Sequence, residues 1–590
     1  MHSDTSLGPG AIRPRASQSA ESRGNLPLGR TTAVWRWVPL APLVFAATAL
    51  AVVPPVAERP LARPSPGQVE WQRRELAMFV HFGPATWENV QHSDLSAPLS
   101  AIDPSQLDSE QWVDVAVSMG AGLIIFVAKH DGGFCWWPTE TTGYSVQHTP
   151  WRDGAGDLMR ELSESCRRRG LKLGVYLSPA DKMHGARVGG RTGNAADQDR
   201  YNSMYRQQLT ELLSRYGEIA EVWFDGGLVV PVADILQLHA PGAMVFQGPQ
   251  ATIRWVGNEE GVAPYPAWNA LPLDKARSGI ATAYDSDPDG TAWLPSECDA
   301  RLRADWFWST GNASTLKSVE SLMRMCYRSV GHGAVLLLNQ TPDRTGQIPE
   351  LDVRRTAEFG AEIRRRFGQS LAETAGRGNL IELSLPRPTW VDHLIAAEEI
   401  SEGERVREYV VEGWMDGAWQ QLCEGTAIGN KKIDIFAPVL VSKVRLRVLR
   451  AAAEPLFRRV ALFLAFGETM PASAREELAA RPLAIGNWSS ENLGLEPSTL
   501  RLDLSRACRD AGVYLLEIAR TAGAPLDVEA VDLLADGQPL KPFVVRREVR
   551  GVPYYQVTIT EEGRRHELEV RAHLRSPDSR GQFLIRRRLK

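Results

Sequence analysis

Residues 201–226 read YNSMYRQQLTELLSRYGEIAEVWFDG and join a helical pattern to a short apolar strand. Up to Tyr216 the apolar residues recur at the spacing of one helix face. Gly217 stands where the C-terminus of a helix favours glycine, and the run VWF at 222–224 is typical of a buried strand. The segment therefore predicts a helix that leads directly into a strand, and that strand ends at a carboxylate, Asp225.

The same alternation of apolar runs and amphipathic segments extends from about residue 70 to about residue 370. The runs that predict strands are Leu76–Val80, Gly122–Val127, Leu173–Leu177, Val222–Phe224, Met244–Phe246 and Val335–Leu338. Continuous apolar runs suit strands of a parallel sheet, which are buried on both faces. No glycine-rich phosphate-binding fingerprint follows the first run, which disfavours a dinucleotide-binding fold. The alternation therefore predicts an α/β barrel or a doubly wound sheet, and of the two we expect a (β/α)8 barrel over residues 69–372.

The pattern changes after about residue 370 to that of half-exposed strands. Apolar and charged residues alternate along 443–448 (KVRLRV), which is the period of a half-exposed strand. Asp416-Gly417 lies between two short apolar runs and predicts a hairpin turn. We expect a carbohydrate-binding-like β-sandwich at 376–467 and a second β-rich, sandwich-like module at 470–590.

The N-terminal segment 1–68 reads as a targeting segment rather than as part of the fold. An arginine-containing leader over residues 1–36 precedes residues 37–57, which carry no charge. This order predicts an export signal, and the uncharged run is also near the length of a membrane anchor. A proline-rich linker follows. We expect an exported protein that is secreted, periplasmic or tethered to a membrane through residues 37–57.

Composition excludes several other classes of protein. The net charge is only −4, and the one basic run lies at the C-terminal end, so we expect no nucleic-acid partner. The six cysteines are scattered without a C-x-x-C pair, and no ligand spacing predicts a metal site. Eighteen tryptophans are compatible with sugar stacking, but tryptophan also fills protein cores.

Polar residues follow the predicted strands at their C-terminal ends, where barrel enzymes carry their chemistry. These residues are His81, the stretch Lys129-His130-Asp131, Tyr176, Asp225 and Asn339. Asp225 is followed by two glycines, a context that also occurs in simple turns. Glu259, Glu260 and Glu297 lie downstream and could supply a second carboxyl group. A pair of carboxyl groups is what glycoside hydrolysis requires.

Five blocks of the sequence resemble glycoside hydrolase family 29, the α-L-fucosidases. They are W-x-x-x-E-L-A-M-F-V-H-F-G at 71–83, A-K-H-D-G-G-F-C-W-W-P-T at 128–139, Y-L-S-P at 176–179, the segment 201–226 and G-H-G-A-V-L-L-L-N at 331–339. P-D-R-x-G from Pro342 continues the match. The resemblance covers about residues 70–370 in order and implies an exo-acting fucosidase that works by double displacement with retention, without a cofactor.

The resemblance also implies roles for individual residues. Asp225 matches the nucleophile of the family. The block R-W-V-G-N-E-E-G-V-A-P-Y-P at 254–266 is similar to the branch that favours α-1,3- and α-1,4-linked fucose, and it implies Glu259 as general acid/base. Glu297, in W-L-P-S-E-C-D, is a reserve for that role, and Glu260 is expected to be a solvated neighbour. The pocket residues that the match implies are His81, His130, Asp131, Tyr176 and Trp137. A fucosylated glycan is the implied partner.

The chain departs from the family pattern at two positions. The family commonly has two adjacent histidines before Asp-Gly-Phe, whereas this chain has His130-Asp131, and the usual tryptophan after Ser-Pro is Ala180. These changes keep two alternatives open: a retaining glycosidase for a related sugar such as galactose, and an inactive barrel that only binds carbohydrate.

Overall fold

The computed structural model describes residues 60–466 without a break. Beyond them it describes the segments 483–488, 498–504, 508, 512–523, 527–539, 545–549, 552–559, 568–575 and 579–587. The predicted export segment therefore lies, up to residue 59, outside the described residues. Among the described residues, no helix combines the length and the apolar character that a membrane crossing requires.

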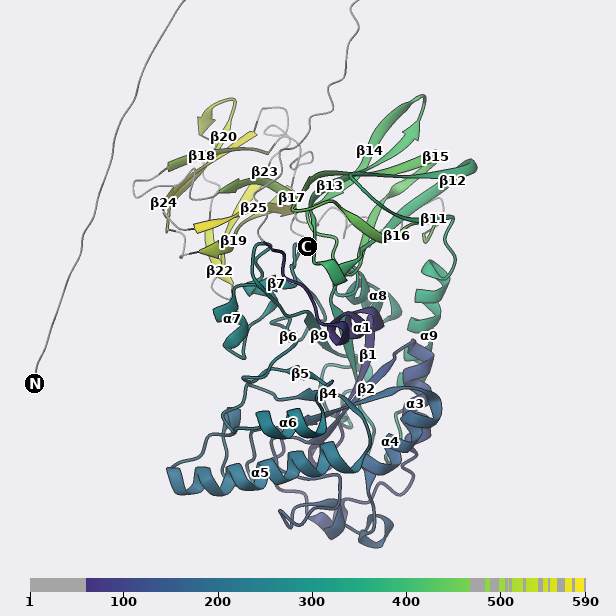
Figure 1. Ribbon diagram of the computed structural model, residues 1–590, viewed down its shortest axis with the longest axis vertical. Helices are drawn as coiled ribbons and strands as arrows, with labels where there is room; N and C mark the ends of the chain where they lie inside the picture. Colours follow the sequence, from purple (N-terminus) through teal and green to yellow (C-terminus); the bar gives the residue numbers. More distant parts are fainter. Residues whose placement is uncertain are drawn as a thin grey trace, which may run out of the picture. The chain divides into compact units, whose positions relative to one another are not determined.

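Eight parallel strands form the first sheet and confirm the predicted barrel (Figure 1). In spatial order they are β5 (Met244–Phe246), β4 (Ile219–Trp223), β3 (Lys172–Leu177), β2 (Leu123–Lys129), β1 (Leu76–Val80), β10 (Val335–Gln340), β9 (Ser296–Arg301) and β6 (Arg254–Trp255). The two end strands β5 and β6 meet through a parallel bridge between Phe246 and Ile253. This bridge brings the sheet close to a closed barrel.

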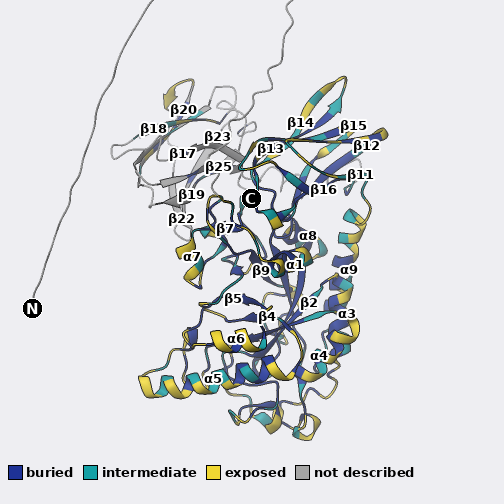
Figure 2. Cartoon of the chain, in the orientation of Figure 1, coloured by how far each residue is buried: buried dark blue, intermediate teal, exposed yellow. Residues whose placement is uncertain are grey.

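Nine α-helices lie among residues 60–466, and the longer ones bury one face and expose the other (Figure 2). They are α1 (Pro66–Arg74), α2 (Pro84–Glu88), α3 (Ser109–Met119), α4 (Leu158–Arg169), α5 (Ala195–Arg215), α6 (Ala233–His239), α7 (Leu273–Arg277), α8 (Val319–Arg328) and α9 (Glu350–Phe367). Helix α5 begins earlier than the apolar stripe alone indicates, because Asn194 caps it by accepting a hydrogen bond from the backbone N–H of Asp197.

The barrel interior is filled by side chains that point inward from alternate strand positions. The Phe246 ring stacks on Trp223 at 3.6 Å between centroids, and the rings of Tyr176 and Phe79 lie 5.6 Å and 5.2 Å from Trp223. Their strand neighbours, such as Met78, point outward into the core beneath the helices. The aromatic interior forms a solid floor below the C-terminal ends of the strands.

The second module is a six-stranded antiparallel sheet. In spatial order its strands are β11 (Ala372–Arg377), β16 (Leu456–Phe463), β12 (Leu380–Glu398), β15 (Lys432–Ala451), β13 (Val406–Met415) and β14 (Ala418–Gly425). The predicted hairpin is confirmed: Met415 pairs with Ala418, and the two turn residues Asp416 and Gly417 have φ of 52° and 78°. Positive φ at both central residues is typical of a tight hairpin turn.

The remaining described segments form two further antiparallel sheets, so the chain past the barrel is β-rich, as predicted. One contains β17 (Leu483–Trp488), β25 (Ser579–Arg587), β19 (Gly512–Gly523), β23 (Val552–Ile559) and β22 (Val545–Val549). The other contains β18 (Ser498–Asp503), β24 (Leu568–Arg575), β20 (Asp527–Ala535) and β21 (Gln538–Pro539). A two-stranded ribbon, β7 (Ala270–Leu271) with β8 (Ala292–Trp293), lies in the loop between β6 and β9.

Candidate active site

Asp225 lies two residues past the end of β4 and is exposed to solvent. The Tyr176 hydroxyl donates a hydrogen bond to Asp225 Oδ2 at 3.1 Å. Burial raises the pKa of Tyr176 well above its ordinary value, and the Asp225 charge raises it further. Tyr176 therefore stays protonated and remains a donor to the carboxylate at every pH at which a folded enzyme works.

The two glycines after Asp225 allow a backbone turn with positive φ. Gly226 and Gly227 have φ of 74° and 85°, which disfavours other residues, and a Cβ at Gly226 would lie 2.5 Å from Cγ1 of Val188. The backbone N–H of Gly227 donates to Oε1 of Gln247 at 3.0 Å. This turn holds Asp225 at the exposed end of its strand.

His81 ends the run of β1 and is buried. Its Nδ1 lies 2.7 Å from Oδ1 of Asn339, and Nδ2 of Asn339 donates to the carbonyl of Trp306 at 2.8 Å. Because the Asn339 nitrogen is used as a donor, its oxygen accepts, so the proton of His81 resides on Nδ1. Burial, with the nearby His130, lowers the pKa of His81 well below its ordinary value. A neutral ring with Nε2 as acceptor suits a sugar hydroxyl.

His130 and Asp131 follow β2 and form a charged cluster. Nδ1 of His130 lies 2.9 Å from Asp131 Oδ1, while Lys182 Nζ and His92 Nδ1 lie 3.1 Å and 3.0 Å from Asp131 Oδ2. Burial opposes ionisation of Asp131, but the hydrogen bonds and charges of His130 and Lys182 outweigh it and lower its pKa well below the ordinary value. The carboxylate of Asp131 is therefore ionised.

The position of Glu259 is set by two partners from the loop and strand beside it. The indole N–H of Trp306 donates to Glu259 Oε2 at 3.2 Å, and the Arg301 guanidinium lies 3.6 Å from the same oxygen. Arg301 also lies over the Trp306 ring at 5.5 Å from its centroid. With 45% of its side chain exposed, Glu259 is accessible to a ligand.

Asp299, which the sequence did not single out, interacts electrostatically with both carboxylates. It is buried on β9, and its Oδ1 accepts a hydrogen bond from the indole of Trp255 at 2.7 Å. Burial raises its pKa well above the ordinary value, and the negative charges of Glu259, Glu297 and Asp225 raise it further.

A row of contacts connects Asp225 to Glu259: the ring of Tyr176, whose hydroxyl donates to Asp225, lies 6.1 Å from that of His81. The His81 ring in turn lies 4.9 Å from Trp306, which donates to Glu259. These contacts bring the two carboxylates into one site.

Glu297 lies deeper, in the barrel interior. It is fully buried, and its Oε2 accepts a hydrogen bond from Trp223 Nε1 at 2.7 Å. It interacts with Glu221, whose Oε2 accepts from Trp71 Nε1 at 2.7 Å. Burial raises the pKa of both carboxyl groups. This placement favours Glu259 over Glu297 as the acid that meets a leaving group.

The structure does not bring Trp137 to the site. It is fully buried in the core, where its indole N–H donates to Oε2 of Glu211 on α5 at 2.8 Å. The aromatic side chains beside the histidines are Trp306 and Phe307 instead, whose rings lie 4.9 Å and 5.3 Å from that of His81. The aromatic-rich stretch after β9, at 305–308 (DWFW), is the sequence signal for them.

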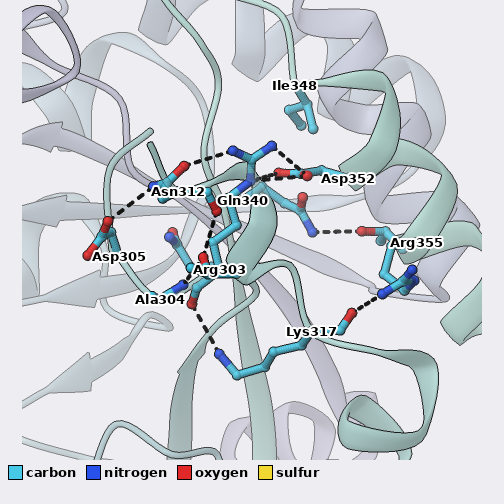
Figure 3. Close-up of polar contacts among 12 residues, drawn as sticks. Arg303, Ala304, Asp305, Asn312, Lys317, Gln340, Ile348, Asp352 and Arg355 are labelled. Carbon is cyan, nitrogen blue, oxygen red and sulfur yellow. Dashed lines mark hydrogen bonds and ion pairs between the residues drawn. The ribbon is translucent and has the colours of Figure 1, made fainter. Parts of the chain in front are cut away.

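A buried ionic network anchors the loop that carries Trp306 (Figure 3). Arg303 donates through two nitrogens to Asp352 at the start of α9, with a shortest distance of 2.9 Å, and through a third to Asn312 at 2.8 Å. Lys317 donates to the carbonyls of Arg301 and Arg303 at 2.5 Å and 3.0 Å. The loop is thereby tied to α9 through Arg303, three residues before Trp306.

Comparison with known proteins assigns the family. A family model described as alpha-L-fucosidase matches residues 68–365. The chain belongs to the α-L-fucosidase family. This makes it a glycoside hydrolase, and it agrees with the carboxyl groups gathered at the C-terminal end of the barrel.

Individual members show the extent of the likeness. The chain is 32% identical to alpha-L-fucosidase 1 of Arabidopsis thaliana over 454 residues, which are 68% of this chain and 88% of that protein. A Ruminococcus gnavus GH29 fucosidase, solved in complex with fucose, is 27% identical with a TM-score of 0.60 over 70% of this chain and 97% of its own. A glycoside hydrolase 29 family member from a rumen bacterium is 26% identical with a TM-score of 0.62 over 90% of this chain and 96% of its own.

Proposed function

We propose that the protein is an exo-acting, retaining α-L-fucosidase that releases terminal fucose from glycans, with Asp225 as nucleophile and Glu259 as general acid/base. The observation that carries this proposal is the row of contacts from Asp225 through Tyr176, His81 and Trp306 to Glu259. Family membership supports the sugar, and the exposed position of both groups supports their access to substrate.

The reaction follows from these positions. Asp225 attacks the anomeric carbon while Glu259 gives its proton to the glycosidic oxygen, so that the glycosidic bond breaks and a glycosyl-enzyme ester forms. Glu259, now a carboxylate, then takes a proton from water as that water attacks the anomeric carbon and releases Asp225. The second attack restores the original anomeric configuration. Tyr176 orients Asp225, while Trp306 and Arg301 orient Glu259.

The linkage preference is proposed from the sequence of the loop that holds Glu259. The block at 254–266 is similar to the branch that favours α-1,3- and α-1,4-linked fucose, and we propose the same preference here. Kinetics on matched oligosaccharides that differ only in an α-1,2, α-1,3, α-1,4 or α-1,6 fucosyl linkage test it. A higher kcat/KM for the α-1,2 or α-1,6 compound contradicts the assignment. Aryl α-L-galactoside, run in parallel, tests whether Asp131 shifts the sugar preference.

The mechanism is tested by two measurements on aryl α-L-fucoside. Proton NMR of the first product formed reads the anomer directly, and β-L-fucose as the first product contradicts retention. Azide should restore the activity of Glu259→Ala by yielding fucosyl azide, because a small anion can replace the water that needs a base. Glu297→Ala is the matched control, and its rescue in place of Glu259→Ala would reverse the two roles.

We also propose that the protein is exported and acts on glycans outside the cytoplasm. The arginine-containing leader and the uncharged run at 37–57 support this location. Fractionation of cells that express the full chain separates the outcomes: activity in the medium or periplasm indicates cleavage, and activity that sediments with membranes indicates a tether through residues 37–57. A chain starting at residue 60 should stay in the cytoplasm.

A further inference from the structure

The His92, His130 and Asp131 side chains converge from two loops of the barrel. A ring nitrogen of each histidine and a carboxylate oxygen of Asp131 all lie within 4.8 Å of one another. Each imidazole contacts a different oxygen of the Asp131 carboxylate. Nδ1 of His92 lies 3.0 Å from Oδ2, and Nδ1 of His130 lies 2.9 Å from Oδ1. His92 and Asp131 are 39 residues apart in the chain, so no local spacing indicates the cluster.

This set of atoms has the composition and dimensions of a transition-metal site. Imidazole nitrogen and carboxylate oxygen bind Zn²⁺ at about 2.0–2.2 Å. In a tetrahedral site of that size neighbouring ligand atoms are roughly 3.3 Å apart, which is close to the two nitrogen–oxygen distances. Because the histidines contact different oxygens of Asp131, an ion that replaced the two hydrogen bonds would bind both oxygens or require the carboxylate to turn.

The orientation of His130 and the exposure of His92 add to the case. The ring of His130 stacks on that of Tyr176, 5.6 Å between centroids and inclined by 14°, so its direction is fixed by the barrel interior. His92 has 69% of its side chain exposed, and its ring lies over that of His130 at 5.7 Å. One ligand is therefore held rigidly and another can close over an arriving ion, with water as the fourth ligand.

We propose that His92, His130 and Asp131 form a binding site for a divalent metal of the zinc class at the mouth of the sugar site, and that the bound ion inhibits the enzyme. The ion would sit beside the ring of His130 and occupy the carboxylate of Asp131 at the mouth of the sugar site, so metal and substrate compete. The inhibitory part rests on the proposed function, whereas metal binding does not.

Lys182 provides an internal competitor for the ion. Its ammonium group lies 3.1 Å from Asp131 Oδ2 and donates to the carbonyl of Ser93 at 2.7 Å. A positive charge at this distance opposes a cation on the same oxygen. With 43% of its side chain exposed, Lys182 can move into solvent when the ion binds. Removal of this charge should therefore strengthen metal binding.

Isothermal titration of the full chain, prepared without a polyhistidine tag, with ZnCl2 measures binding directly. We expect one saturable ion per chain, no comparable response to MgCl2, because Mg²⁺ prefers oxygen ligands, and recovery of the metal-free enzyme with EDTA. His92→Ala should weaken binding by at least about tenfold, since even residues behind the ligands cost that much. Lys182→Met should strengthen it. His148→Ala, an exposed histidine elsewhere, is the matched control and should change nothing.

The kinetic arm measures inhibition of aryl α-L-fucoside hydrolysis by the same salt. We expect ZnCl2 to raise KM without lowering kcat in the wild type, and His92→Ala to lose this sensitivity relative to its own metal-free KM. The proposal is overturned if the full chain shows no saturable binding, or if His92→Ala and His148→Ala bind equally. If no fucoside is hydrolysed, the proposed function fails while the titration still decides the metal site.

Discussion

The hydroxyl of Tyr176 donates to Oδ2 of Asp225 at 3.1 Å, and the Tyr176 ring is held by stacking on Trp223 in the barrel floor. A hydrogen bond to a charged group contributes about 1.5–3 kcal/mol, and it fixes the direction from which the carboxylate attacks. Tyr176→Phe should therefore lower kcat/KM on aryl α-L-fucoside by about 10- to 100-fold, with little change of thermal stability. Initial-rate kinetics and a thermal melt measure the two effects.

A matched tyrosine elsewhere in the barrel provides the control. The Tyr216 hydroxyl donates to Oδ2 of Asp157 at 3.2 Å, which is the same type of contact away from the site. Tyr216→Phe should leave kcat/KM within about twofold of the wild type, because its effect is confined to stability. Equal losses of kcat/KM in the two variants would show that Tyr176 acts only on folding.

Trp306 acts on Glu259 rather than on the nucleophile. Loss of its indole N–H in Trp306→Phe removes the 3.2 Å hydrogen bond to Glu259 Oε2 and leaves the ring in place. Proton donation matters most when the leaving group is an alcohol. We therefore expect kcat/KM to fall by about tenfold for an oligosaccharide, and much less for a dinitrophenyl fucoside, whose leaving group needs no proton.

The control for Trp306 lies two residues away. Trp308 packs under the Arg344 guanidinium at 5.9 Å and has no contact with Glu259 among those described. Trp308→Phe should preserve the ratio of kcat/KM between the two substrates. If Trp306→Phe slows both substrates by the same factor, its role is to bind the sugar and not to position Glu259.

Two buried carboxyl groups in the barrel interior, Glu221 and Glu297, should make the stability of the fold depend on pH. Burial raises the pKa of Glu221 and of Glu297, so the folded chain binds protons that the unfolded chain has released. The stability contributed by these protons is present below the unfolded pKa of about 4.3 and is lost as pH rises through the raised values. Urea unfolding at several pH values between 5 and 8 should show stability falling with pH (range chosen to span the titration of the pair).

Glu297→Gln tests the source of that dependence. A neutral amide keeps the shape and accepts the Trp223 hydrogen bond through its oxygen, so the variant should lose part of the slope and gain stability at the upper end of the pH range. Glu70→Gln, on the surface with 68% of the side chain exposed, should keep the wild-type slope. An unchanged slope in Glu297→Gln would mean that other groups carry the effect.

The sequence predicted the parts of this site that depend on strand ends. His81, His130, Asp131, Tyr176 and Asp225 stand directly after or at the end of apolar runs, and parallel strands bring such positions to one end of a barrel. Contacts between separate loops could not be predicted in the same way. Nothing local in the sequence links Glu259 to the loop of Trp306, or His92 to Asp131, because these partners meet only after the barrel has closed.

The sequence also could not predict how deep a side chain lies in the barrel or in which direction it points. Glu297 and Asp299 lie two residues apart and share one face of β9. They differ in depth: Glu297 interacts with the buried Glu221, whereas Asp299 interacts with Glu259. Trp137 lies in a loop that matches the family, and a loop has no periodicity to tell whether its side chain turns to the sugar or to α5. Family resemblance therefore indicated the segment correctly while leaving the direction open.

The buried pair of Arg303 and Asp352 should determine both stability and the position of the loop that carries Trp306 (Figure 3). Arg303→Met leaves the Asp352 carboxylate buried without its partner, which costs about 3–5 kcal/mol. Urea unfolding should show this loss, and kcat/KM on an oligosaccharide should fall because Trp306 loses its anchor.

The double variant Arg303→Met/Asp352→Leu should recover much of the stability, since an apolar pair can replace a buried ion pair. Arg354→Met, from the exposed pair with Glu350, should cost less than about 1 kcal/mol. If the double variant regains stability but not activity, the polar network itself positions the loop, and apolar packing alone does not suffice.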